Sequence, residues 1–400
     1  MLRNMKNLRP YMGIRMGLLL FHMAFLPAVG IALEAPEGSK TISSAVVPFV
    51  DRQALAGAVM LVATGDKVLS VGSVGWSDVA AHRPMRNDAL FWIASQSKAM
   101  TAACVMMLVD EGRVRLDDPV EKYLPEFRNQ MLVVERDADH TLLRKPAHPI
   151  TVREILSHTS GLPFSSPMEQ PTLDGMPLRD AVRSHAMMPL QFQPGTKYQY
   201  SNAGINTAGR IIEVISGMPY EQFMTLRLFK PLGMKDTTFW PNAQQIKRLA
   251  KSYKPNQSKT GLEETTITQL RYPLSDRANR HPMPAGGLFS TAGDTASFCQ
   301  MILSGGVHKG RRLLSEESIK QLTTRQTAPD LKDSYGLGLA VGPDWCGHGG
   351  AYATNMQIDH KQGLVLVWMV QHNGFPAGGS QAQEAFKQTA LDAFGQNRQR

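Results

Sequence analysis

The chain has few cysteines and few charged residues for its length, and each shortage excludes a class of protein. Three cysteines in 400 residues, Cys104, Cys299 and Cys346, cannot form a disulfide framework, and their spacing is not that of a zinc site. Charged residues make up only 19%, which argues against a coiled coil or an acidic tail. No segment repeats at a period of tens of residues, so a solenoid or a propeller is disfavoured.

The motifs of two large hydrolase classes are also missing. There is no G-x-S-x-G, so an α/β-hydrolase nucleophile elbow has no support. The 11 histidines include no H-x-x-x-H pair, so a zinc protease has no support either. Hydrophobic residues nevertheless make up 42%, enough to bury a large core in one large domain or two intertwined ones.

The net charge of +9 does not indicate nucleic-acid binding. Residues 1–32 hold four of the 43 basic residues and none of the 34 acidic ones, so the rest of the chain has a surplus of five. The one short basic cluster, residues 309–312, has no aromatic side chains among it. A scattered surplus of this kind predicts no nucleic-acid partner.

The first 32 residues have the pattern of an export signal. A basic stretch over 1–15 precedes the apolar residues 16–33, and Gly30-Ile31-Ala32 offers small residues to a signal peptidase. Pro27 near the end of the apolar run favours cleavage; an uncleaved anchor is the alternative, since a span needs about 20 apolar residues. We expect a signal peptide over 1–32, a periplasmic or secreted mature chain, and no membrane contact after cleavage.

Strand patterns lie at both ends of the chain and helix patterns lie between them. Strands are predicted over 56–62, 68–76, 335–341, 351–358 and 364–371, and helices over 42–54, 95–111, 203–215, from 291 onward and over 381–394. We expect an α+β fold in which both termini build one antiparallel sheet with flanking helices. The predicted α/β lobe covers 33–97 and 285–400, and a mostly helical lobe, 98–284, is inserted into it with a site in the cleft between.

Ser95-Gln96-Ser97-Lys98 is the first candidate for chemistry. Residues three apart share a helical face, so Ser95 and Lys98 are neighbours at the start of a helix, where unpaired N–H groups favour a developing anion. Serine needs a base to become a nucleophile. Lys98 serves only if its pKa is lowered, because about 1 lysine in 2,500 is neutral at pH 7. By itself the motif also fits an N-cap serine followed by a solvated lysine.

Two further segments change this interpretation. Tyr200-Ser201-Asn202 opens a predicted helix and either presents a phenol and an amide to the cleft or supplies a core tyrosine and a cap. His348-Gly349-Gly350 begins a predicted β run, and its glycines allow a ligand to approach the backbone closely.

With these motifs in this order, the sequence resembles the serine β-lactamase and penicillin-binding protein superfamily. The resemblance is to the class C β-lactamase-like branch, which includes family VIII carboxylesterases and D-amino-acid-specific peptidases, and it covers most of 45–395. Further matching segments are 116–120, 123–125, 150–162, 194–195, 231–234 and 286–291. The implied fold is that of the β-lactamases and transpeptidases.

The resemblance also implies roles. Ser95 is the nucleophile that becomes acylated, and Lys98 and Tyr200 share the proton transfers, with the base at each step left open. The N–H groups of Ser95 and Ala351 form the oxyanion hole. Asn202 orients Lys98 or a substrate carbonyl. His348, Gly349 and Gly350 bind substrate, and no metal or cofactor is implied.

One position departs from the family pattern, because His348 stands where the K-T-G motif has lysine. An imidazole is mostly neutral at pH 7 and supplies little constant charge to a substrate carboxylate. If His348 does bear charge, turnover of a carboxylate-bearing β-lactam rises as the pH falls toward 6.

We therefore expect a secreted serine hydrolase acting on a small ester or amide. The favoured activity is a carboxylesterase of broad acyl specificity with weak or no β-lactamase activity. The alternatives are a β-lactamase or D-amino-acid peptidase and, from another class, a non-catalytic penicillin-recognising binding protein. The sequence does not set the oligomeric state.

Overall fold

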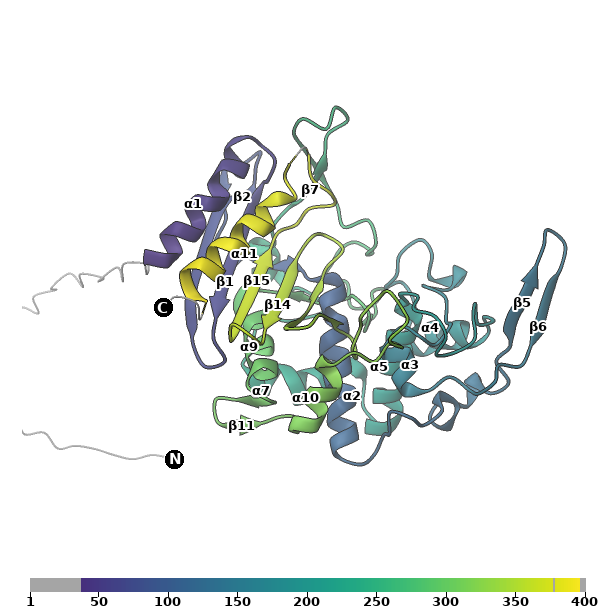
Figure 1. The fold of residues 1–400 in the computed structure, drawn as a ribbon. Coiled ribbons are helices and arrows are strands. Elements are labelled where there is room, and N and C mark those ends of the chain that lie inside the picture. Colours follow the sequence, from purple (N-terminus) through teal and green to yellow (C-terminus); the bar gives the residue numbers. More distant parts are fainter. Residues whose placement is uncertain (1–36, 377, 396–400) are drawn as a thin grey trace, which may run out of the picture. The chain divides into compact units, whose positions relative to one another are not determined.

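The computed structural model describes residues 37–376 and 378–395, which fall in one unit of the chain (Figure 1). The predicted signal peptide lies outside the described residues and stays a prediction, as do the predicted lobe boundaries. None of the helices within the described ranges combines the length and apolar character that crossing a bilayer requires.

A seven-stranded antiparallel sheet is built from both ends of this unit, in the order β12-β13-β14-β15-β1-β2-β3. Its strands are β1 (Gly57–Ala63), β2 (Val68–Asp78), β3 (Arg83–Pro84), β12 (Ala340–Val341), β13 (Trp345–Gly349), β14 (Asn355–Asp359) and β15 (Leu364–Met369). β1 lies between β2 and β15, so the N-terminal and C-terminal parts meet at the centre of the sheet. The predicted α+β fold is confirmed.

The central strands are apolar throughout because both faces of the sheet are covered. Side chains alternate across a strand, so Val59 and Leu61 enter one core while Met60 and Val62 enter the other. α1 (Glu37–Asp51) and α11 (Gln381–Phe394) cover one face, and α9 (Ala292–Leu303) packs on the other (Figure 1).

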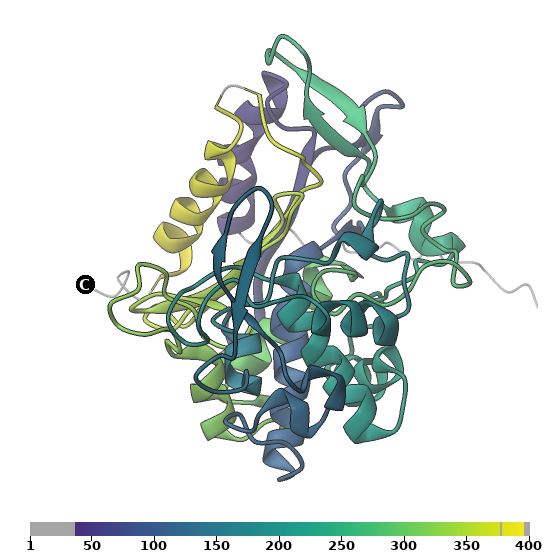
Figure 2. The ribbon, with the colours of Figure 1, turned by 90° about the vertical axis from the view of Figure 1, so that its right-hand side faces the viewer.

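The remaining helices and four short strand pairs come after β3 and before β12 along the chain. The helices are α2 (Ser97–Asp110), α3 (Val152–Leu156), α4 (Leu178–Ala186), α5 (Asn202–Ser216), α6 (Tyr220–Met224), α7 (Lys230–Leu232), α8 (Ala243–Arg248) and α10 (Glu316–Thr323). The pairs are β4 (Phe91–Trp92) with β9 (Phe289–Ser290), β5 (Leu132–Arg136) with β6 (Thr141–Arg144), β7 (Ser252–Pro255) with β8 (Leu262–Thr265), and β10 (Val307–His308) with β11 (Arg311–Arg312). α2 is buried from Ser97 to Leu108 and packs against α5 and α10. The β5–β6 hairpin, dark blue in the foreground of Figure 2, stands away from the helices.

Several predicted boundaries near the C-terminus are wrong. Only residues 340–341 of the predicted strand 335–341 are extended in the sheet, because Gly338 turns the chain with φ +69°. The predicted strand 351–358 begins only at Asn355, after a turn in which Ala353 has φ +63°. β13 was not predicted as a strand, since Trp345-Cys346-Gly347-His348-Gly349 lacks the β-branched residues that mark one. His348 and Gly349 therefore end a strand instead of starting one.

A buried ion pair joins two long loops of the helical part. Arg280 Nε donates to Asp174 Oδ2 at 2.6 Å, and both side chains are 2% exposed or less. Asp174 Oδ1 also accepts from the Arg271 N–H at 2.9 Å, and Arg280 Nη1 donates to the Phe239 carbonyl at 3.0 Å. The pair therefore fixes the loop before α4 to the loop after β8.

We expect Asp174→Asn to lower the free energy of unfolding by about 3–5 kcal/mol, because it leaves a buried guanidinium without its counter-charge. The matched control is Asp117→Asn, which breaks the pair with Arg153 at a carboxylate that is 74% exposed. This change should cost less than about 1 kcal/mol. Urea denaturation measures both, and equal small losses would show that the buried pair does not hold the loops.

Candidate active site

Ser95 lies at a sharp corner between a strand and a helix. It lies in a 3₁₀ helix one turn long, Ala94–Gln96. α2 begins only at Ser97, two residues later than predicted. Ala94 has φ +46°, a left-handed conformation that costs a residue with a side chain about 1–2 kcal/mol. Ser97 Oγ holds the corner by donating to the Ala94 carbonyl at 2.6 Å and accepting from the Leu288 N–H at 3.2 Å.

Lys98 is fully buried, and its amine reaches Ser95. Nζ lies 3.1 Å from Ser95 Oγ and 2.7 Å from the Ala285 carbonyl, to which it donates. Burial lowers the pKa of Lys98 well below its ordinary value, so the neutral amine is favoured. Asn206, which the sequence analysis missed, supports this contact because its Oδ1 accepts from the Ala285 N–H at 3.0 Å. Its place one helical turn after Asn202 was the only signal.

Tyr200 joins the pair from the loop before α5. Lys98 Nζ lies 4.6 Å from the centroid of the phenol ring. Burial raises the pKa of Tyr200, and a hydrogen bond with Ser95 opposes that shift. The phenol is therefore protonated at neutral pH, while the adjacent amine favours its neutral form. The structure brings together the three side chains that the sequence singled out.

His158 holds the segment that carries Tyr200. Its Nδ1 accepts a hydrogen bond from the Ser201 N–H at 3.1 Å, so the ring proton must be on Nε2. The imidazole packs on Tyr200 with the ring centroids 4.5 Å apart. Burial lowers the pKa of His158 well below its ordinary value, and the repulsion that a protonated Lys98 or His348 would exert acts in the same direction. His158 is thus a neutral positioning residue, not a second base.

His348 is engaged at both ring nitrogens. Nδ1 donates to the Gly349 carbonyl at 2.6 Å, so Nε2 accepts the hydroxyl proton of Tyr335 at 2.9 Å. Burial, with the adjacent Lys98 amine, lowers the pKa of His348 to about 3. Tyr335, which the sequence analysis treated only as a strand residue, therefore makes His348 a neutral group with no free donor for a substrate.

The chain after β13 returns close to the Ser95 corner. A Cβ atom on Gly350 would lie 2.6 Å from the Ile93 carbonyl oxygen, so only glycine fits there. The N–H groups of Ser95 and Ala351 have no hydrogen-bond acceptor among the residues that the structure describes. Two free donors on segments in contact are what an oxyanion hole requires.

Asn202 is the predicted residue whose bonding differs from expectation. It begins α5, and its N–H donates to the Phe164 carbonyl at 3.0 Å. Its Oδ1 is buried and has no partner within the described ranges, and Lys98 donates to Ala285 instead. Asn202 is left available to a substrate.

The profile of the family described as Beta-lactamase matches residues 42–390. The chain belongs to the beta-lactamase family. It is a serine hydrolase, as its fold and relatives show. Uncharacterized protein MT1414 of Mycobacterium tuberculosis is 32% identical over 366 residues, 80% of this chain and 87% of that protein. Esterase EstB of Burkholderia gladioli is 32% identical over 228 residues, 54% of this chain and 55% of that one.

A solved structure supports the family fold. EstCE1, a hydrolase with promiscuous acyltransferase activity, matches with a TM-score of 0.73 at 21% identity, over 88% of this chain and 98% of that chain. The predicted β-lactamase/transpeptidase-like fold is confirmed.

We expect His158→Leu to lower kcat for p-nitrophenyl butyrate by about 10²-fold with little change in KM, because it leaves the Ser201 N–H without its acceptor and displaces Tyr200. His158 has φ +61°, which asparagine tolerates, and asparagine also offers an acceptor. His158→Asn should therefore keep kcat within about tenfold. Equal losses in the two variants would contradict a positioning role.

Proposed function

We propose that the chain is an exported carboxylesterase that hydrolyses small neutral esters through an acyl intermediate on Ser95. In this proposal it has broad acyl specificity and weak or no β-lactamase activity. The observation that carries it is the neutral His348–Tyr335 pair at the place where the family pattern has a fixed cation. Export rests on the predicted signal peptide, which would deliver the mature chain to the periplasm or outside the cell.

Acylation uses the contacts around Ser95. Oγ attacks the ester carbonyl carbon while its proton passes to the neutral Lys98 amine, 3.1 Å away. The N–H groups of Ser95 and Ala351 stabilise the oxyanion. As the bond to the alcohol breaks, Tyr200 gives its proton to the leaving oxygen and regains one from Lys98.

Deacylation reverses these transfers with water in place of the alcohol. Water attacks the acyl carbon and loses a proton through Tyr200 and Lys98, and the bond to Ser95 Oγ breaks with return of the proton to Oγ. The products are the free acid and the original enzyme. No metal or cofactor is needed for this balance.

The electrostatics of the site favour a neutral substrate. Within the described part of the chain, Lys98 is the only lysine or arginine that forms a hydrogen bond, ion pair or ring contact with Ser95, Tyr200 or His348. Because Lys98 favours its neutral form, a substrate carboxylate meets no fixed positive charge there. The likeness to esterase EstB supports the same choice.

We expect Ser95→Ala to reduce hydrolysis of p-nitrophenyl butyrate by a factor on the order of 10⁴ or more. Ser297→Ala removes a hydroxyl that is bonded only within α9. This variant is the matched control and should hydrolyse the ester at the unchanged rate. Nitrocefin and D-alanyl-p-nitroanilide, assayed beside the ester, distinguish the three activities. Faster turnover of either would replace the esterase proposal, and no turnover of any would support a binding protein. Mass spectrometry should find the acyl group on Ser95.

We also expect the ratio of kcat/KM for nitrocefin to that for p-nitrophenyl butyrate to be constant from about pH 5 to pH 8. Burial lowers the pKa of His348 to about 3, so the imidazole gains its proton only below this range and offers the nitrocefin carboxylate no charge within it. A ratio that rises toward pH 5 would show that His348 binds the carboxylate as a cation.

A further inference from the structure

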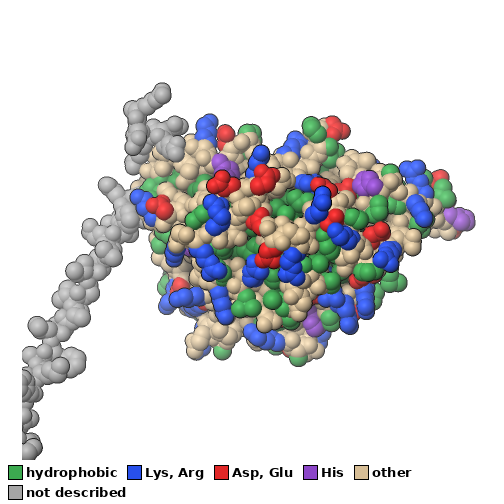
Figure 3. Space-filling view, turned by 90° about the horizontal axis from the view of Figure 1, so that it is seen from below, with side chains coloured by type: hydrophobic (Ala, Val, Ile, Leu, Met, Phe, Trp, Pro, Cys, Tyr) green, Lys and Arg blue, Asp and Glu red, His purple; other side chains and the backbone are tan. Residues whose placement is uncertain are grey.

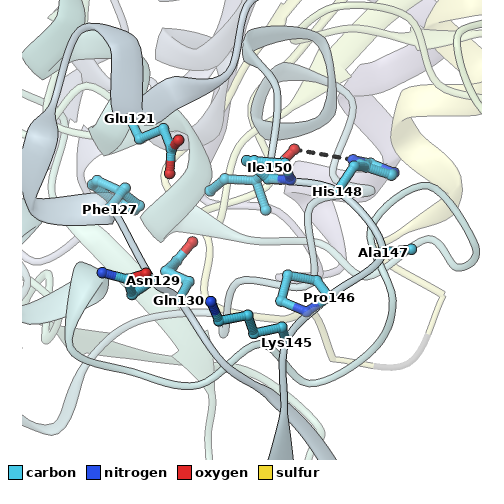
Figure 4. Close-up of a pocket in the computed structure, with 10 residues that line it drawn as sticks. Glu121, Phe127, Asn129, Gln130, Lys145, Pro146, Ala147, His148 and Ile150 are labelled. Carbon is cyan, nitrogen blue, oxygen red and sulfur yellow. Dashed lines mark hydrogen bonds between the residues drawn. The ribbon is translucent and has the colours of Figure 1, made fainter.

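A cavity lies at the base of the β5–β6 hairpin, and its lining is separate from the residues of the candidate active site. Its volume is about 250 Å³. Its walls are formed by Glu121, Phe127, Asn129, Gln130, Lys145, Pro146, Ala147, His148, Pro149 and Ile150 (Figure 4). None of these residues belongs to the proposed machinery around Ser95. The lining comes from the turn before the hairpin and from the segment that follows it.

The walls of this cavity are fixed to the body of the protein. The Val120 N–H donates to the Ile150 carbonyl at 2.9 Å, and the Ala147 N–H donates to Gln193 Oε1 at 3.0 Å. On the hairpin side, the Leu190 N–H donates to the Met131 carbonyl at 2.7 Å. A cavity with such walls is preformed, which lowers the ordering cost of binding.

Gln130 gives the cavity an unsatisfied polar group. Its amide nitrogen and its amide oxygen are both buried, and neither has a hydrogen-bond partner within the described residues. An unpaired buried amide destabilises the protein, so a bound polar molecule that pairs with it is stabilised. This amide can both donate and accept.

Two opposite charges face the cavity without neutralising each other. In Figure 4 the Glu121 carboxylate enters from one side and the Lys145 amine points in from the other. Neither forms an ion pair in the part of the chain that the structure describes, although the adjacent Lys122 pairs with Asp118 at 2.8 Å. His148 also lines the cavity, but both of its ring nitrogens are engaged. Nδ1 donates to the Pro149 carbonyl and Nε2 lies 3.6 Å from the Glu154 carboxylate.

We propose that this cavity binds a small apolar zwitterion, an amino acid or a dipeptide. The ligand's ammonium group pairs with Glu121, its carboxylate pairs with Lys145, and Gln130 bonds its polar backbone atoms. The Phe127 and Ile150 side chains, both 3% exposed, supply an apolar wall for the ligand's side chain. The volume equals that of about eight water molecules in the liquid, which is enough room for a ligand of this size.

Isothermal titration calorimetry with leucine and with leucylglycine tests the proposal on the full mature chain. We expect at least one of them to bind, and N-acetylation or amidation of that probe to weaken binding at least about tenfold, because each removes one charge. Glu121→Gln and Lys145→Met should have the same effect. Glu126→Gln, an exposed carboxylate of the next turn that does not line the cavity, is the matched control.

Further readouts separate this cavity from the ester site. Ser95→Ala should bind the probe as tightly as the unchanged protein, and the cavity variants should hydrolyse p-nitrophenyl butyrate normally. Because the ligand would join Glu121 to the end of β6, hydrogen exchange at β5 and β6 should slow when it binds. Failure of both probes to bind, equal binding by the blocked probes, or binding that the cavity variants leave unchanged would overturn the proposal. The blocked probes decide the matter even if a variant does not fold.

Discussion

The site depends on keeping the amine of Lys98 buried and uncharged. An ammonium ion taken out of water without a counter-charge costs several kcal/mol, so the amine is favoured in its neutral form. The position of the amine is fixed on two sides, by the buried helix α2 and by the Ala285 carbonyl. Ala285 is held in turn by its N–H, which donates to Asn206 Oδ1. The strained corner at Ala94 then brings the Ser95 hydroxyl within 3.1 Å of that amine.

The aromatic and imidazole groups around this amine are also buried in their neutral forms. His158, Tyr200, Tyr335 and His348 form ring contacts with one another, and burial moves the pKa of each toward its neutral form. Neutral groups can be buried together without charge pairs, and hydrogen bonds and ring contacts hold this cluster, although His158 Nε2 has no hydrogen-bond partner within the described ranges. The chemistry we propose for Ser95 moves protons through this cluster and leaves the resting enzyme uncharged there.

Local sequence patterns predicted the helices and strands whose own residues favour the structure that they adopt. α11 was predicted with its observed bounds, 381–394, and the predicted helix 203–215 lies within one residue of α5 at either end. β13 was missed because pairing with β14, not β-branched side chains, makes it a strand. The β5–β6 hairpin was missed as well, since its residues lie in a region of helix-like periodicity. The helix predicted from 291 onward is α9, which Thr291 caps by accepting from the Asp294 N–H, while the Asp294 carboxylate accepts from the Asp236 N–H and the Thr237 hydroxyl.

Local motifs were enough to single out the side chains to which we assign the chemistry, because Ser95 and Lys98 are one helical turn apart and the Tyr200 motif follows in the family's order. It also determined the antiparallel sheet from both termini, since the apolar runs at each end require partners. The charge of the site, in contrast, could be read only once the chain was seen folded. The roles of Tyr335, Asn206 and His158 depend on contacts between segments far apart in the chain, and burial, which no local pattern encodes, sets the protonation of Lys98 and His348.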